Sequence, residues 1–81
     1  MTWYVYVLQS TTGRLYTGIS PDPVKRLAMH NAGKGAKATR AGRPWRIVHQ
    51  ETLGPKGDAL RREAAIKKLS RAEKLRLVQA R

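Results

Sequence analysis

The chain has 81 residues, enough for one domain expected to span 1–81, and its 17 Lys and Arg against 5 Asp and Glu give a net charge of +12. It has no cysteine, no signal-peptide pattern after its first Met and no run of roughly 18 apolar residues, which excludes disulfides, cysteine-bound zinc and a spanning helix and favours the cytoplasm. So basic a surface attracts polyanions and makes nucleic acid the expected partner; a plain solvated surface or a ribosome-associated protein is the alternative.

Two short strands are predicted near the N-terminus. Residues 2–9 and 15–20 are rich in aromatic and β-branched side chains, and the polar cluster at 10–14 between them is typical of a turn. The chain has no phenylalanine, yet its three tyrosines all fall in these strands: Tyr4, Tyr6 and Tyr16. A tyrosine adds a hydroxyl to the aromatic bulk, and that hydroxyl needs a hydrogen-bond partner or a chemical function.

The length of the hairpin loop decides whether Tyr6 and Tyr16 lie on one face of the sheet. Side chains alternate along a strand, so a shift of one residue moves a side chain to the other face. A two-residue loop at 12–13 separates the two rings, whereas a three-residue loop at 12–14 pairs Tyr6 with Ser20 and brings them together. The residues alone leave both alternatives open.

A helix is predicted after the hairpin. Asp22 followed by Pro23 is typical of an N-cap and a first helical residue, and the helix is expected to run to about Ala32 and to stop at Gly33. Its apolar stripe is expected to consist of Val24, Leu27 and Ala28.

The second half of the chain predicts one more strand and two more helices. Residues 33–43 are small and basic and are expected to form a loop, and 45–52 are typical of a strand. Asp58 is expected to cap a helix at 59–69, and a capping box at 70–73 predicts a further helix. The order is therefore β-β-α-β-α-α, an α+β domain with a mainly antiparallel sheet.

A few helical side chains suggest a function. Arg26 and His30 are four residues apart and so are neighbours on their helix, although an ordinary surface Arg and His are the simpler interpretation. Glu63 falls on the inward side of its helix, where a carboxylate is costly unless it is paired or binds a cation; a salt bridge or a rim position is the alternative. Glu51, by contrast, is expected to reach solvent.

Together these residues resemble the motifs of the GIY-YIG nuclease superfamily, and most closely its small stand-alone bacterial branch. The resemblance covers nearly the whole chain, and the order and spacing of the motifs are more specific than any one of them. The motifs are Tyr4-Val-Tyr6, Tyr16-Thr-Gly18, Arg26, His30-Asn31 and Arg62-Glu63-Ala-Ala-Ile-Lys67.

The chain departs from the family pattern at two motif positions. The first-motif Gly is Tyr4, and the middle Ile of the second motif is Thr17; both are common kinds of variation in the family. Some family nucleases also use a late asparagine. This chain has none after Asn31, so that role is either empty or filled by Asn31.

The resemblance implies a sheet of three antiparallel strands flanked by helices, with both motif tyrosines lining one active site. This implication favours the three-residue loop at 12–14, which puts the two rings on one face. The residues to which it gives catalytic roles are Tyr6, Tyr16, Arg26, His30 and Glu63.

The implied reaction is phosphodiester hydrolysis assisted by Mg²⁺ or Mn²⁺. Glu63 would hold the ion through one carboxylate, with waters completing its shell, and Arg26 would offset charge on the scissile phosphate. Tyr6 is expected to be the general base, with Tyr16 and His30 positioning water and phosphate. Because a free tyrosine titrates at about 10, His30 is the rival base.

The expected substrate is DNA, with RNA as the alternative. Cleavage is expected to show little sequence preference and to depend on the structure of the DNA, and the family makes repair or recombination the expected process. The loop is expected to bind the nucleic-acid backbone, since the chain has no zinc finger or helix-turn-helix pattern. A protein partner for targeting is possible, and the alternative function is a basic nucleic-acid-binding protein that keeps the fold without turnover. The expected binding residues are Gly18, Asn31, Lys34, Lys37, Arg40 and Arg43.

Overall fold

The computed structural model describes residues 1–79 and has the element order β-β-α-β-α-α that the sequence predicts, with one added turn of 3₁₀ helix, η1. Its elements are β1 (Trp3–Ser10), β2 (Leu15–Ser20), α1 (Pro23–Asn31), η1 (Lys37–Thr39), β3 (Trp45–Gly54), α2 (Lys56–Lys67) and α3 (Arg71–Gln79). The three strands form an antiparallel sheet in the order β2-β1-β3, so the α+β class is confirmed. Within residues 1–79 no helix is long and apolar enough to cross a membrane.

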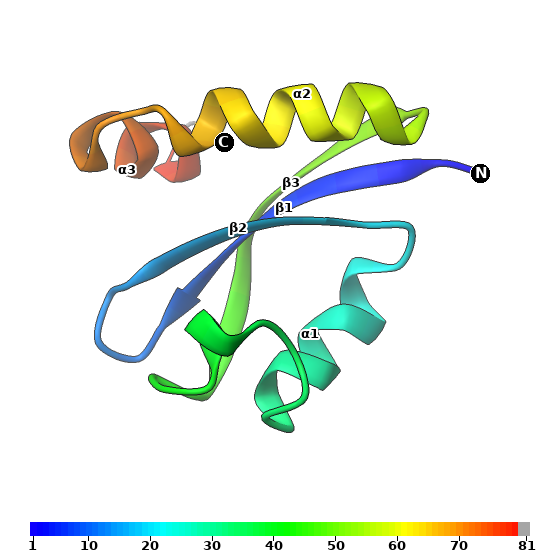
Figure 1. The fold of residues 1–81 in the computed structure, drawn as a ribbon. Helices are drawn as coiled ribbons and strands as arrows, with labels where there is room; N and C mark the ends of the chain where they lie inside the picture. The colour runs from blue at the N-terminus through cyan, green and yellow to red at the C-terminus, as the bar shows by residue number, and fades with distance from the viewer. Residues whose placement is uncertain (80–81) are drawn as a thin grey trace.

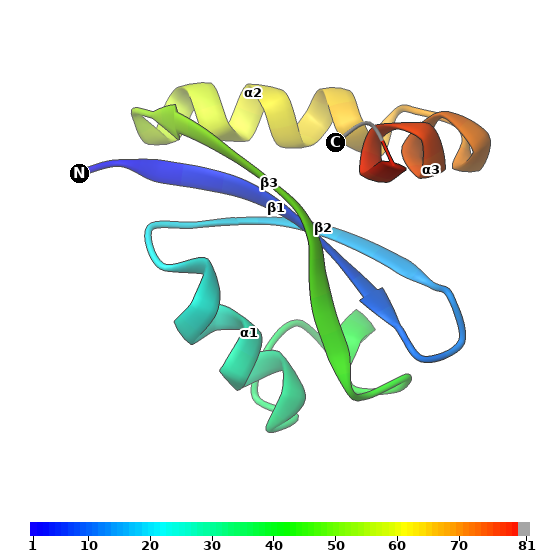
Figure 2. The ribbon, with the colours of Figure 1, turned by 180° about the vertical axis from the view of Figure 1, so that it is seen from behind.

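The twisted sheet separates two helical layers. Helices α2 and α3 lie on one side of it, and α1 and η1 lie on the other (Figure 1; Figure 2 from behind). Central strand β1 contributes buried side chains to the core on both sides of the sheet, because alternate side chains point to opposite faces. Val5 and Val7 pack with Ile66 of α2, whereas Tyr6 and Leu8 pack with Trp45 on the other face. The α1 face therefore carries the first-motif tyrosine.

The hairpin register confirms that the two motif tyrosines share a face, but it corrects the expected pairing. Tyr6 pairs with Gly18 rather than with Ser20. The three-residue loop is 11–13 and not 12–14: the amide of Arg14 donates to Oγ of Ser10 at 3.0 Å and closes the turn one residue earlier than expected. The shift moves the pairing by two residues, which preserves the face of every side chain.

Helix α1 begins and ends as expected but buries a different stripe. Oδ1 of Asp22 accepts a hydrogen bond from the amide of Lys25 at 3.1 Å, and the backbone turns into the left-handed region at Gly33 with φ of +77°. The predicted stripe is wrong, because Val24 is 71% exposed and Ala28 is also exposed. The residues that face the sheet share the helical spacing i, i+4, i+7: Pro23, Leu27 and His30.

The C-terminal helices show one wrong cap and one confirmed cap. Helix α2 begins at Lys56 after Pro55, so Asp58 is not its N-cap but lies in its first turn, where it pairs with Arg61. The extended backbone of Pro55 starts the helix earlier, and a carboxylate in the first turn still suits the helix dipole. The capping box before α3 is present, with the amide of Ser70 donating to Glu73 at 2.9 Å and the amide of Glu73 donating back at 3.2 Å.

Strand β3 runs two residues beyond the expected 45–52 and carries an ion-pair cluster. Glu51 reaches solvent only in part, since its side chain is 25% exposed. Nε of Arg62 on α2 donates to Oε1 at 2.7 Å and Nη2 donates to Oε2 at 2.9 Å, while Nε2 of His49 lies 2.7 Å from Oε2. This bidentate contact joins β3 to α2.

Candidate active site

The centre of the candidate site is a buried contact between a phenol and an imidazole. Oη of Tyr6 on β1 lies 3.0 Å from Nε2 of His30 on α1. Their exposed fractions are 1% and 0%, so this hydrogen bond does not compete with bulk water. The simpler interpretation of His30 as a surface residue is therefore wrong: the helix turns this side chain, and not Val24, toward the sheet.

Tyr16 belongs to the same cluster, and Gly18 leaves the space that the two tyrosine rings occupy. The ring of Tyr16 meets His30 edge-on, with ring centroids 5.2 Å apart. At Gly18, on the strand beside β1, an added Cβ would lie 2.7 Å from Oη of Tyr6 and 3.2 Å from the Tyr16 ring. The glycine thus permits the close approach of the Tyr6 and Tyr16 side chains. Its contact with nucleic acid stays a prediction.

The other nitrogen of His30 has a partner that no sequence motif indicates. Nδ1 lies 2.7 Å from Oγ1 of Thr39 in η1, and Thr39 is fully buried. The expected loop at 33–43 therefore folds against α1, and a Cβ added at Gly35 would overlap the same nitrogen. The signal available in the sequence was a lone threonine among small and basic residues, and only the fold brings its hydroxyl to the imidazole.

Arg26 lies beside this cluster and acts on it through its charge. Burial first, and the neighbouring Tyr16 second, raise the pKa of the Tyr6 phenol to about 12, although the positive charge of the Arg26 guanidinium acts to lower it. Burial first, and the charge of Arg26 second, lower the pKa of His30. At neutral pH the pair is therefore a neutral phenol facing a neutral imidazole.

Glu63 acts on the cluster from the helical layer on the other side of the sheet. Helix α2 packs over β1 and β2, and the negative charge of Glu63 helps to raise the pKa of Tyr6. The Glu63 side chain is 19% exposed, and Oε2 lies 3.3 Å from Nζ of Lys67, so the expected alternative of a salt bridge is present as well. Glu63 is thus coupled to the phenol through its charge while it pairs with a lysine on its own helix.

The donor set around Glu63 fits a weakly held hard cation. Residues 1–79 contain no group of three or more His, Cys, Asp or Glu side chains that would enclose a metal. Mg²⁺ keeps several waters and commonly takes only one or two carboxylates from a protein, so the single carboxylate of Glu63 suits it. Lys67, whose side chain is 53% exposed, has room to move aside.

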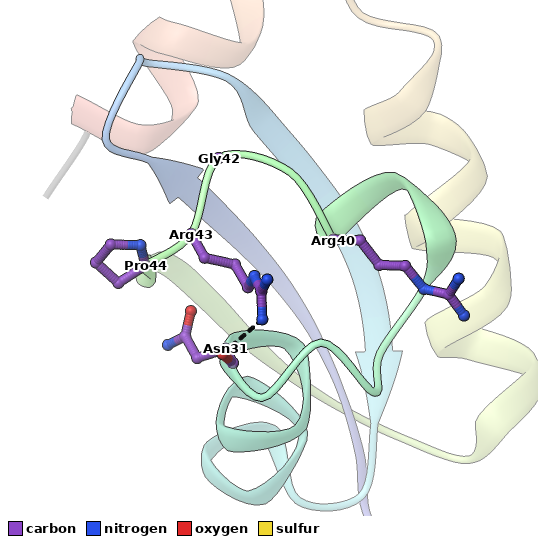
Figure 3. Close-up of a pocket in the computed structure, with 5 residues that line it drawn as sticks. All are labelled: Asn31, Arg40, Gly42, Arg43 and Pro44. Carbon is purple, nitrogen blue, oxygen red and sulfur yellow. Dashed lines mark hydrogen bonds between the residues drawn. The ribbon is translucent and has the colours of Figure 1, made fainter.

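Three of the expected binding residues, Asn31, Arg40 and Arg43, line a shallow pocket next to the end of α1, whereas Gly18, Lys34 and Lys37 do not line it. Figure 3 shows Asn31, Arg40, Gly42, Arg43 and Pro44 lining it, with the Arg43 guanidinium donating to the backbone oxygen of Asn31 at 3.4 Å. The segment between α1 and β3 carries four cationic side chains: Lys34, Lys37, Arg40 and Arg43. Their positions suit contacts with a polyanion, and the contacts themselves stay a prediction.

The Asn31 side chain already has a structural task. Its Nδ2 donates to the backbone oxygen of Trp45 at 3.0 Å, and its Oδ1 accepts from the Trp45 amide at 2.6 Å. Both arms of the amide therefore hold the start of β3 against α1. A further contact of Asn31 with nucleic acid stays a prediction.

Comparison with known proteins assigns the class to which this site belongs. The sequence profile described as the GIY-YIG catalytic domain matches residues 2–76, so the chain belongs to the GIY-YIG family. Within that family its relatives are small bacterial proteins named UPF0213. The protein from Aeromonas salmonicida (strain A449) is 49% identical over 77 residues, which cover 95% of this chain and 57% of that protein.

Other relatives match over more of their own length. The UPF0213 protein of Cupriavidus pinatubonensis (strain JMP 134) is 47% identical over 73 residues, covering 90% of this chain and 81% of that protein. The solution NMR structure of the UPF0213 protein from Bacillus halodurans has a TM-score of 0.65 at 41% identity and covers 100% of this chain and 86% of that chain. The chain thus spans a little over half of the Aeromonas relative and most of the other two.

Proposed function

We propose that the protein is a divalent-metal-dependent endonuclease that hydrolyses phosphodiester bonds in DNA. The observation that carries this proposal is the 3.0 Å contact between the buried Tyr6 hydroxyl and Nε2 of His30, with the Arg26 guanidinium beside it. A phenol that is hydrogen-bonded to an unprotonated imidazole can accept a proton from water because it can pass its own proton to the imidazole. A guanidinium can bind the phosphate through paired hydrogen bonds. The expected catalytic set of Tyr6, Tyr16, Arg26, His30 and Glu63 is retained.

The Tyr6–His30 pair answers the difficulty that tyrosine is a weak base. Because the pKa of Tyr6 is raised to about 12, a standing phenolate is scarce at neutral pH. In the proposed step Oη of Tyr6 takes a proton from the attacking water while its own proton passes to Nε2 of His30. The imidazole ends as imidazolium, the phenol stays neutral, the hydroxide oxygen bonds to phosphorus, and the bond from phosphorus to the leaving nucleotide oxygen breaks. That leaving oxygen takes a proton from solvent water.

The remaining residues stabilise charge and orient groups. Arg26 forks onto the scissile phosphate and offsets the negative charge that grows in the transition state. The Tyr16 ring holds His30 edge-on and directs its own hydroxyl toward water or phosphate. Glu63 would hold Mg²⁺ or Mn²⁺ with waters, and the bound ion would stabilise charge on the leaving oxygen.

A non-catalytic nucleic-acid-binding protein is the second candidate. The 3.3 Å pair between Glu63 and Lys67 favours it, because an ammonium then occupies a side of the carboxylate that a cation would use. This candidate keeps salt-sensitive binding and predicts no turnover. A basic scaffold without a nucleic-acid role predicts neither.

A plasmid-nicking assay separates these functions. The wild type is expected to relax supercoiled DNA with Mg²⁺ and not with EDTA, and Glu63→Gln is expected to lose about 100-fold or more of that rate. Asp58→Asn is the matched control, since it removes a carboxylate from the same helix outside the site. Equal residual cutting in the wild type and Glu63→Gln would point to a contaminant and end the catalytic proposal.

A further inference from the structure

The hydroxyl of Thr39 has one proton, and its direction is fixed by the geometry of η1. Oγ1 donates that proton to the backbone oxygen of Ala36 at 2.8 Å. The same Oγ1 lies 2.7 Å from Nδ1 of His30, and with its proton already used it can only accept there. Nδ1 of His30 must therefore carry the hydrogen.

From this geometry we propose that Thr39 is a positioning residue that fixes His30 as the Nδ1–H tautomer. A neutral imidazole has one donor and one acceptor nitrogen, so a proton on Nδ1 leaves the lone pair on Nε2. Nε2 is the nitrogen that lies 3.0 Å from Oη of Tyr6, so the phenol is the donor in that bond. The chain of donors runs from Tyr6 to His30, to Thr39 and to the carbonyl of Ala36.

The surroundings hold Thr39 in this role. Its side chain is fully buried, its amide donates to the Ala36 carbonyl at 2.9 Å, and its own carbonyl accepts from Nε1 of Trp45 at 2.9 Å. Gly35 lies so close to the imidazole that any side chain there would displace it. These contacts tie the basic segment between α1 and β3 to the candidate site.

The tautomer follows from the hydrogen bonds alone, but its effect on catalysis rests on the proposed nuclease function. With the opposite tautomer, Nε2 would carry a hydrogen and would be unable to take a proton from Tyr6. A phenol facing an N–H loses its proton exit, although the ring positions stay the same. Thr39 would thus affect the rate of the chemical step more than the affinity for DNA.

The direct test is ¹⁵N NMR of the imidazoles in the full chain at a pH where both histidines are neutral. The chain has two histidines, so His49 serves as an internal reference and a His49→Gln variant assigns the signals. The wild type and Thr39→Ser are expected to show His30 as Nδ1–H. Thr39→Val, which keeps the shape without the hydroxyl, is expected to lose that preference.

Two results would overturn the proposal. A wild-type spectrum with the hydrogen on Nε2 of His30 would do so, and this holds even if Thr39→Val fails to fold. A folded Thr39→Val protein that retains a pure Nδ1–H signature would do so as well. Thermal melting and amide spectra of each variant establish that it is folded.

Cleavage kinetics separate this inference from the proposed function. Thr39→Val is expected to lower the Mg²⁺-dependent cleavage rate by about 10- to 100-fold with little change in DNA affinity, and Thr39→Ser is expected to restore it. If the wild type does not cut DNA, the nuclease proposal fails while the NMR result still decides the tautomer. If the wild type cuts DNA and Thr39→Val cuts it equally fast, Thr39 has no positioning role.

Discussion

At Gly18 a missing side chain decides the geometry of the candidate site. The Tyr6 phenol crosses β2 at this position, and any Cβ would lie 2.7 Å from its oxygen. The family motifs include this glycine and the residues of the cluster, because motif residues can be matched one by one. They did not indicate Thr39, since the partner of a buried imidazole depends on how a loop folds back.

Gly18→Ala is expected to lower the cleavage rate by about 100-fold while leaving the fold intact, because a shift of about 1 Å in a reacting group has an effect of this size. Gly57→Ala on α2 is the matched control, since its Cβ would meet only Nη1 of Arg61, at 3.6 Å. Single-turnover cleavage by the two variants checks the prediction. Equal rates would show that the Tyr6 phenol does not need this space.

Among the elements, the sequence predicted what is decided locally. The Asp22 cap and the Ser70–Glu73 box rest on bonds between residues three apart, and both are present. The apolar stripe of α1 and the hairpin register were wrong because packing against the sheet and the exact turn decide them. The predicted start of α2 was wrong because the helix begins after Pro55, before Asp58.

The contact between β3 and α2 predicts an acid-sensitive stability. Hydrogen bonds from Arg62 first, and from His49 second, lower the pKa of Glu51, so its folded value lies below its ordinary 4.5. A lowered carboxyl pKa stabilises the fold above the unfolded pKa, and this contribution is lost as the pH falls through the folded pKa.

Glu51→Gln is therefore expected to lower the free energy of unfolding by about 1–2 kcal/mol at pH 7 and by progressively less below pH 4.5. Urea unfolding of both proteins across this range measures the difference. Asp58→Asn, which removes an exposed ion pair on α2, the helix that carries Arg62, is the control and is expected to change little. A difference that stays constant from about pH 7 to about pH 3 would contradict the assignment.

For the whole molecule, the basic composition predicted a polyanionic binding partner, and the fold determines where the basic side chains lie. Both helical layers carry cations, and those of the segment between α1 and β3 are Lys34, Lys37, Arg40 and Arg43. Sequence patterns predicted the α+β class and the element order because strand alternation, turn residues and most helix caps are local signals. They did not predict the 3₁₀ turn or the pocket of Figure 3, which depend on how that segment packs.

Replacing Lys37 and Arg40 together by Gln is expected to weaken DNA binding equally across sequences and to reduce the salt slope of log K by about 0.9 for each phosphate that is no longer neutralised. Arg61→Gln is the control, since its side chain is 76% exposed and lies on the opposite helical layer. Binding measured from low to moderate salt checks this. A larger effect at Arg61 would place the DNA on the other layer.

The hydroxyl of Tyr6 offers the most direct test of the catalytic proposal. Mg²⁺-dependent nicking is measured for the wild type, for Tyr6→Phe and for Tyr4→Phe, which removes a hydroxyl from the same strand outside the His30 contact. Tyr6→Phe is expected to be slower by a factor of about 100 to 10,000, whereas Tyr4→Phe should match the wild type. Cleavage by Tyr6→Phe at the wild-type rate would contradict a role for this phenol in the reaction.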